Sequence, residues 1–349
     1  MDTRPSPTRP QKPSPGINHP IGPRRFFLTV ITLSLSVATS IFSPRFTQAA
    51  EVRITKLEDK LRIELGGNLF CEYVYSATNS RPYIYPILGP GGLPMTRNWP
   101  MREVEGEERD HPHHRSFWWA HGDINGVDFW SESARSGKTL HDTFLAIEPG
   151  NQIGTVRSRN RLIKADGTLV GLTEQTMRFW GDDNARWIDF EITVRASNGE
   201  LVFGDTKEGT MAVRLAETMR LKPNKAGLGA GHIINSEGIR DNQAWGKRAR
   251  WVDYHGPVQN QLVGLAIFDH PNNPRHPTWW HVRDYGLFAA NPFGIHDFER
   301  KPAQTGNLVV PSGESITFKY RFYLHRGADK TAAVAEKYNE YVREIQSGR

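Results

Sequence analysis

The chain has 349 residues, with 44 basic against 38 acidic side chains, an imbalance that would suit a polyanionic partner. Six of the basic residues but only one acidic residue lie at or before Ala49, so 38 basic and 37 acidic residues remain after this leader. The nearly neutral remainder removes the electrostatic argument for nucleic acid as a partner. The one cysteine, Cys71, excludes an intramolecular disulfide framework and a multi-cysteine zinc or iron–sulfur site.

Residues 1–49 have the pattern of an export signal and N-terminal leader. Arg24 and Arg25 precede the apolar run 26–42, and the small-residue sequence TQAA follows it. The run is shorter than the roughly 20 residues that a spanning helix needs, and the arginine pair also fits the twin-arginine export pattern. We therefore predict an exported protein, periplasmic or extracellular, with the twin-arginine route open and no transmembrane span in the mature chain.

Beyond the leader, apolar and polar residues alternate with a period of two more often than 3.6. The stretch VRITKLEDKLRIELGGNLFCEYVYS, which begins at Val52, predicts three strands separated by turns. Further strands are expected at 154–163, 169–179, 187–196, 211–215, 262–268 and 315–324. Hairpin turns are expected at Asp166-Gly167, at 181–184 and at Asn198-Gly199.

Only the C-terminus has a convincing helical pattern. Its apolar stripe at helical spacing consists of Val334, Tyr338, Tyr341, Val342 and Ile345. Asp329 is the expected N-cap of this helix, and the stripe is expected to dock on the rest of the domain. Many strands joined by hairpins, without alternating helices, predict a mainly β fold: an antiparallel β-sandwich with a C-terminal helix. We expect residues 50–349 to form this single domain.

The first segment that could carry chemistry is DHPHHRSFWWAHGDINGVDFW, residues 110–130, which holds four histidines. If it is extended, Phe117, Trp119 and His121 share one face and Trp118 the other. Neutral imidazoles are metal ligands and acid–base groups near neutral pH, and an arginine fork binds carboxylates. The catalytic candidates are His113, His114 and His121, and the substrate-binding candidates are Arg115 and Asp123. The alternative is that the histidines only pair with nearby acids and carbonyls.

The second segment is FGDTKEGTMAVRLAE, in which Gly204 and Gly209 bracket a polar turn. A carboxylate where one strand ends and the next begins, with a lysine beside it, is suited to be a general base or a cation ligand. Glu208 is therefore a catalytic candidate and Asp205 a substrate-binding one. The same residues would also suit an ordinary solvated turn, so the case for Glu208 depends on its meeting the histidines in space.

The third segment is DHPNNPRHPTWWHVRDYGLFAANPFG, residues 269–294. Trp279 and Trp280 stand beside His281 and Arg283, and a flat apolar face edged by polar donors suits a sugar ring. These four residues are predicted to bind substrate. A tryptophan pair is as commonly part of a core, because aromatic side chains supply much of its buried area.

Several motifs are absent from the sequence: a glycine-rich phosphate loop, a His-Glu-x-x-His helix and a Gly-x-Ser-x-Gly elbow. The many histidines leave a divalent metal open as a cofactor, although no spacing specifies one. The sequence makes no cofactor certain.

The sequences HHRSFWWAHGDINGVDFW, GDTKEG and PTWWHVRDYGLFAANPFG, in this order behind an export signal, resemble a bacterial exported family commonly labelled "methane oxygenase PmoA" or PmoA-like. The resemblance runs from about Val52 to the terminal helix. It implies an exported β-sandwich without an established reaction, in bacteria that often degrade complex polysaccharides. The architecture is similar to sugar mutarotase-like domains, which suggests a mutarotase-like supersandwich whose concave sheet carries histidines and a carboxylate.

Together these patterns favour an exported carbohydrate-active enzyme, a hydrolase, lyase or epimerase that uses His/Glu acid–base chemistry. The expected partner is a carbohydrate or another small molecule. One alternative is a non-catalytic glycan-binding module. The other is a metal-dependent oxidoreductase, in line with the oxygenase label, although the membrane subunit of that name is built of spanning helices that this sequence does not predict.

Overall fold

The computed structural model describes residues 10–12, 16, 22 and 50–348. The predicted export signal, residues 1–49, lies almost wholly outside these residues and stays a prediction. Residues 50–348 lie in one compact unit. Within the described residues, no helix combines the length and the apolar character needed to cross a membrane.

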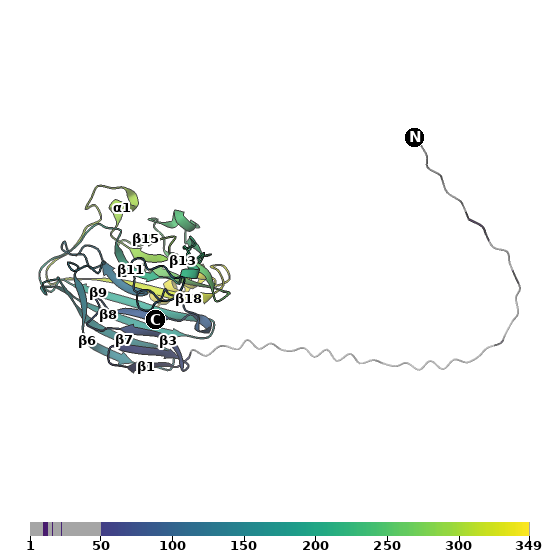
Figure 1. The fold of residues 1–349 in the computed structure, drawn as a ribbon, viewed down its shortest axis with the longest axis horizontal. Helices are drawn as coiled ribbons and strands as arrows, with labels where there is room; N and C mark the ends of the chain where they lie inside the picture. The colour runs from purple at the N-terminus through teal and green to yellow at the C-terminus, as the bar shows by residue number, and fades with distance from the viewer. Residues whose placement is uncertain (1–9, 13–15, 17–21, 23–49, 349) are drawn as a thin grey trace, which may run out of the picture. The chain divides into compact units, whose positions relative to one another are not determined.

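Two eight-stranded sheets form the body of this unit, and all strands within each are paired antiparallel (Figure 1). The first sheet has, in spatial order, β1 (Val52–Lys56), β2 (Lys60–Leu65), β3 (Asn68–Val74), β4 (Tyr83–Ile87), β5 (Phe117–His121), β11 (Gly209–Arg214), β16 (Leu287–Asn291) and β15 (Trp279–Val282). The second has β12 (His232–Asn235), β13 (Trp251–Val258), β14 (Gln261–Asp269), β18 (Ser315–Arg326), β9 (Ala185–Arg195), β8 (Leu169–Gly181), β7 (Gly154–Ile163) and β6 (Lys138–Glu148).

Short elements complete the unit. A two-stranded ribbon pairs β10 (Leu201–Phe203) with β17 (Leu308–Val310). The helical elements are η1 (Pro90–Gly92), η2 (Glu217–Met219), η3 (Asp241–Ala244), α1 (Ile295–Glu299) and α2 (Val334–Gln346).

The core lies between the two sheets, where alternate residues of each strand meet. On β9 the inward residues are Ile188, Phe190, Ile192 and Val194. They face Phe117 of the first sheet, whose ring centroid lies 5.7 Å from that of Phe190. Cys71 is buried in the same core, as expected of a free cysteine. The predicted mainly β, antiparallel sandwich is confirmed.

Strand prediction succeeded where alternation is long and regular and missed several strands, among them β6 and β13, where it is interrupted. The predicted strands at 154–163, 169–179 and 187–196 correspond to β7, β8 and β9. The register of β6 shifts twice against β7, which breaks its period of two. In β13, Gly256 and Pro257 interrupt the pattern, and proline argues against a strand when only the sequence is read.

The C-terminal helix docks as predicted but begins later. Val334, Tyr338 and Tyr341 of α2 are buried in a cluster with side chains from β14 and β18. The N-cap is Ala333, so the prediction of Asp329 as the cap was wrong. At the start of the helix, the backbone carbonyl of Asp329 accepts a hydrogen bond from the Val334 N–H at 3.0 Å.

A tight turn after β5 is formed by Asn125 and Gly126, with φ angles of 53° and 75°. We expect Gly126→Ala to lower the free energy of unfolding by about 1–2 kcal/mol, because a left-handed backbone strains a residue with a Cβ. A Cβ added at Gly126 meets no atom within 4 Å, so steric overlap does not contribute. Denaturant unfolding measures the change. Gly126→Asn is the control and should cost less, since asparagine tolerates this conformation; equal losses would contradict the backbone explanation.

Candidate functional site

The three segments singled out in the sequence occupy neighbouring strands of the first sheet. The first segment contains β5, the second β11 and the third β15 and β16, and their spatial order is β5-β11-β16-β15. Residues directly opposite one another across these strands are Trp118, Ala212, Ala289 and His281. This row lies on the side of the sheet that faces away from the sandwich core, here called the outer face. The sheet thus joins segments that are far apart in the chain.

Three histidines of the loop before β5 form a group of stacked rings over this face. The rings of His111 and His114 stack at 4.7 Å, and those of His113 and His114 meet edge to face at 4.5 Å. Tyr285 stacks on His111 at 5.1 Å, and Trp118 stacks on His114 at 5.2 Å. The first and third segments therefore contact each other directly through these rings.

His114 lies in a buried network of charges rather than in open space. Its Nδ1 accepts a hydrogen bond from Arg214 at 3.1 Å, which leaves its proton on Nε2. Arg214 also pairs with Asp110 at 3.0 Å, and the same carboxylate pairs with Arg97. Both arginine side chains are 0% exposed, so Asp110 is the carboxylate shared by two buried cations.

This network shifts the pKa values of Asp110 and His114. Burial raises the pKa of Asp110, but a hydrogen bond from His111 and the charges of Arg214 and Arg97 outweigh it and hold the pKa well below its usual range. Burial, followed by the charge of Arg214, holds the pKa of His114 well below its ordinary value. His114 is consequently neutral and suited to positioning its neighbours.

Arg81 fixes the backbone that carries His113. It is 2% exposed, and its guanidinium donates to the carbonyl of His113 at 3.0 Å and to those of Phe129 and Trp130 at 2.8 and 2.7 Å. The loop before β5 is thereby tied to the chain that returns after it.

Glu208 lies in the loop that leads into β11, half exposed, and pairs with Lys207 at 2.7 Å. Burial, with the charge of Arg81, lowers the pKa of His113 to about 4, and the Glu208 carboxylate opposes that shift. The same carboxylate opposes the lowering of the His281 pKa and adds to the raising of the Tyr285 pKa. Glu208 thus acts electrostatically on aromatic side chains of the first and third segments.

His281 and Tyr285 have defined hydrogen-bonding roles. The Nδ1 of His281 donates to the Lys207 carbonyl at 2.6 Å, so its Nε2 is an acceptor. Burial lowers the pKa of His281 to about 4, which keeps the ring neutral. Burial raises the pKa of Tyr285, so its hydroxyl keeps the proton that it can donate.

Arg283 completes the group. Its guanidinium lies 5.6 Å from the ring of Tyr285 and 5.8 Å from that of Trp245. Both Arg283 and Trp245 line a cavity of about 200 Å³. The arrangement offers a carboxylate, a protonated hydroxyl, neutral imidazoles and a cation, which together could exchange protons with a small polar molecule and hold it.

Two candidates of the first segment lie apart from this group. His121 faces the sandwich core, where its Nε2 contacts the Gly204 carbonyl at 2.8 Å and its ring lies 4.6 Å from that of Phe293. Arg115 forms two hydrogen bonds with Glu132, at 2.7 and 2.8 Å, so its fork is already occupied.

The two predicted aspartates hold loops. Asp123 accepts from the Gly126 N–H at 2.8 Å inside its own turn. Asp205 accepts from the His296 N–H at 2.9 Å and from the Gly306 N–H at 2.6 Å, and so connects the second segment to α1. Backbone donors therefore occupy both oxygens of Asp205 and one oxygen of Asp123.

The tryptophan pair of the third segment does not offer the open stacking surface that was predicted. Trp280 is 0% exposed in the sandwich core, and its Nε1 donates to the Ala249 carbonyl at 2.9 Å. Trp279 is on the opposite side of β15, where its Nε1 donates to Glu299 at 2.9 Å and Arg248 covers its ring at 4.5 Å. Alternation along the strand sends the two rings to opposite faces, so they cannot form one platform.

Sequence reasoning missed Arg97, Arg214 and Tyr285, although two of these lie within the segments singled out. The signal for Arg214 was a charged residue in an otherwise apolar strand. Such a residue is seldom fully buried unless it is paired.

Three side chains of the types that bind metal ions lie close together at the second sheet. One oxygen or nitrogen from each of Asp253, His255 and Asp329 lies within 4.8 Å of the others. Both Asp253 oxygens accept from histidines, at 2.7 Å from His255 and 2.8 Å from His325. A carboxylate on Nδ1 leaves the Nε2 of His255 for an ion, as in many metal sites. The residues come from β13 and from the loop before α2, a combination that no local spacing predicts.

The structure thus defines an antiparallel β-sandwich protein with a polar and aromatic group on the outer face of one sheet. A model described as "Family of unknown function (DUF6807)" matches residues 60–339, and the chain belongs to this family. That description confirms a family of unknown function and does not carry the PmoA-like label. No curated protein sequence matches the chain.

Solved structures with a similar course of the chain are only distantly related. A galactose mutarotase related enzyme from Lactobacillus acidophilus is 8% identical over 80% of this chain and 98% of its own, with a TM-score of 0.29. A putative aldose 1-epimerase from Escherichia coli K12 is 12% identical over 78% of this chain and 98% of its own, with a TM-score of 0.25. A glycoside hydrolase family 97 enzyme from Pseudoalteromonas sp. strain K8 is 10% identical over 79% of this chain and 35% of its own, at 0.32. These likenesses are too weak to assign a function.

Proposed function

We propose that the chain is an exported carbohydrate-active enzyme that acts on a sugar by acid–base chemistry at the outer face of the first sheet. One observation carries the proposal: the three segments contact one another, since Tyr285 stacks on His111 at 5.1 Å and His281 binds the carbonyl of Lys207, the neighbour of Glu208, at 2.6 Å. The charge of Glu208 accordingly affects the pKa values of His113, His281 and Tyr285. Titratable groups with perturbed pKa values that gather at one place are typical of catalytic sites. Export rests on the leader pattern of residues 1–49.

The proposed roles follow from the protonation states. The Glu208 carboxylate or the neutral His113 ring accepts a proton from the substrate, and the Tyr285 hydroxyl donates one. The Nε2 of His281 accepts a hydrogen bond from a sugar hydroxyl, and Arg283 holds a polar or anionic substituent. A hydrolase, a lyase and an epimerase all need such a donor and acceptor around one C–O or C–H bond. Arg115, His121, Trp279 and Trp280 have no role in this proposal.

Incubation of the mature protein with a panel of mono- and oligosaccharides, followed by proton NMR of the anomeric signals, tests the proposal. We expect wild type to convert at least one sugar, and His113→Gln to convert it about 100-fold more slowly, a typical loss when an acid–base group is removed. His232→Gln is the control, because this exposed histidine lies on the other sheet. Full activity in His113→Gln would overturn the proposed role.

A metal-dependent enzyme is the second candidate, favoured by the group of Asp253, His255 and Asp329. The acid–base proposal needs no metal ion at Glu208, so we expect turnover to be unchanged after treatment with EDTA. The measurement is the sugar conversion rate before and after chelation, together with elemental analysis of the purified chain. The metal-dependent candidate would be favoured instead if EDTA abolished turnover and one metal restored it in wild type. The same metal should then fail to restore turnover in Asp329→Asn.

A further inference from the structure

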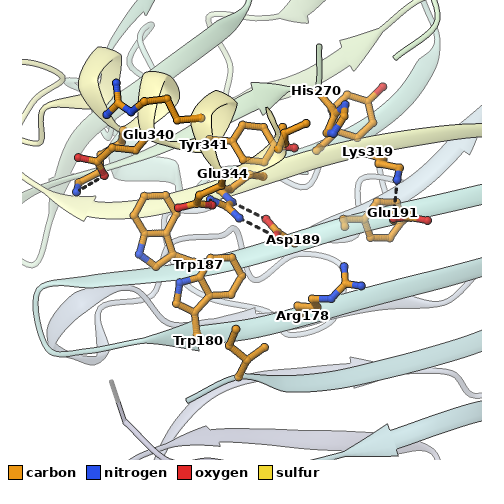
Figure 2. Close-up of a pocket in the computed structure, with 17 residues that line it drawn as sticks. Arg178, Trp180, Trp187, Asp189, Glu191, His270, Lys319, Glu340, Tyr341 and Glu344 are labelled. Atoms are coloured by element: carbon orange, nitrogen blue, oxygen red, sulfur yellow. Dashed lines mark hydrogen bonds and ion pairs between the residues drawn. The ribbon is translucent and has the colours of Figure 1, made fainter. Parts of the chain in front are cut away.

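A cleft of about 1110 Å³ lies on the second sheet, on the side that faces away from the sandwich core. Its floor comes from β8, β9 and β18, and α2 forms one wall (Figure 2). None of the residues around Glu208 lines it. The cleft therefore belongs to a different surface from the proposed acid–base site.

Strand register accounts for the floor. Trp180 of β8 lies directly opposite Trp187 of β9, and Arg178, two residues before Trp180, lies opposite Asp189. Residues two apart on a strand share a face, so these side chains all point into the cleft. The rings of Trp180 and Trp187 are parallel within 5°, with centroids 6.0 Å apart. Figure 2 shows them side by side, with Arg178 further along the same strand.

The acidic side chains of the cleft are already paired with cations. Asp189 and Glu344 both bind Arg321, at 2.7 and 2.6 Å. Glu191 binds Lys319 at 3.2 Å, and Glu340 binds Lys337 at 2.7 Å.

Two of the cations that line the cleft have no acidic partner among the described residues. Within the described part of the chain, no ion pair is found for Arg178 or Arg343, and both side chains are exposed. Burial, with the charge of Lys319, lowers the pKa of His270 to about 4, so this lining residue is a neutral hydrogen-bonding group. The cleft thus combines an apolar aromatic floor with two cations that lack an acidic partner.

We propose that this cleft binds an oligosaccharide that carries carboxylates, that is, one built of uronic acid residues. Tyr323 stacks on the Trp187 ring at 4.0 Å and the Arg321 guanidinium lies over the Trp180 ring at 5.0 Å. The apolar face of a sugar ring would lie on the aromatic surface that these two neighbours leave open, and the Arg178 fork would bind the carboxylate. The volume exceeds that of a typical pocket for one small molecule, which favours more than one sugar ring. Because most of the cleft's charges cancel in pairs, a densely charged polyanion is a poorer match than a chain with one carboxylate per ring.

Calorimetric titration of the mature protein tests the proposed ligand. One titration uses a short oligogalacturonate, and the other uses the methyl ester of the same oligosaccharide. We expect the acid form to bind at least about 10-fold more tightly than the ester, the usual range for a charge-assisted hydrogen bond. Arg178→Gln should remove that preference, and Trp180→Ala should weaken the binding of both ligands. Arg161→Gln, an exposed cation of β7 outside the cleft, should leave both affinities unchanged.

Arg178 is exposed, so its variant should fold even if Trp180→Ala does not. Absence of binding by either ligand, or equal binding in wild type and Arg178→Gln, would overturn the proposal. Equal affinity for an acidic peptide would also overturn it, because the cleft would then recognise charge alone. Glu208→Gln should bind the oligogalacturonate as tightly as wild type does. Binding in the cleft can therefore be judged separately, even if the acid–base proposal fails.

Discussion

Replacing Asp110 with alanine is expected to lower the free energy of unfolding by about 3–5 kcal/mol, the range for breaking a buried ion pair from one side. Arg97 and Arg214 are both 0% exposed, and both pair with this carboxylate. Without it, two guanidinium groups stay buried with less compensation. Chemical denaturation at neutral pH measures the loss.

A matched surface pair provides the control. Glu103 and Arg109 form an ion pair at 2.8 Å with side chains that are 61% and 63% exposed, so Glu103→Ala should cost less than about 1 kcal/mol. Because the pKa of Asp110 is lowered in the folded chain, its contribution is present above the ordinary aspartate pKa and is lost as the pH falls through the folded value. Wild type and Asp110→Ala should therefore become more alike in strong acid. A loss below 1 kcal/mol at neutral pH would contradict this reading.

Glu208→Gln is expected to reduce sugar turnover by about 100- to 10,000-fold, the contribution of a general acid–base group. The amide keeps the shape of the side chain but accepts a proton poorly. Stability should change by less than about 1 kcal/mol, because the pair with Lys207 is solvent exposed. The rate constant and the unfolding midpoint are measured on the same preparations.

Glu148→Gln, an exposed glutamate at the end of β6, is the control for this substitution. The pH dependence gives a second readout. His113 has a pKa of about 4 and is neutral above it, so the wild-type rate should fall as the pH drops through about 4 and the ring gains a proton. Turnover that survives Glu208→Gln would leave the charge of this residue without a catalytic role.

The fold was largely predictable because long strands with one buried face have a regular period of two. In β7, β8 and β9, buried residues alternate with more exposed ones over ten residues or more. β5 shows why orientation was harder to predict. Alternation correctly separated His121 from Trp118, but both faces of this strand are buried, so the pattern could not identify the one that meets the core.

The site was predictable in its segments and unpredictable in its geometry. Polar and aromatic density marked the three stretches, and the order β5-β11-β16-β15 explains why they meet. That order depends on pairings between strands separated by long stretches of chain, which local patterns do not encode. Partners such as Glu132 for Arg115 and Ala249 for Trp280 are likewise set by tertiary contacts.

The guanidinium of Arg81 has a consequence for the energetics of ligand binding. It holds the carbonyl of His113 together with those of Phe129 and Trp130, so this part of the loop is already ordered when no ligand is bound. A ligand that meets His113 does not have to immobilise that backbone, and fixing one residue would cost about 1–2 kcal/mol of conformational entropy. More of the contact energy therefore remains as affinity.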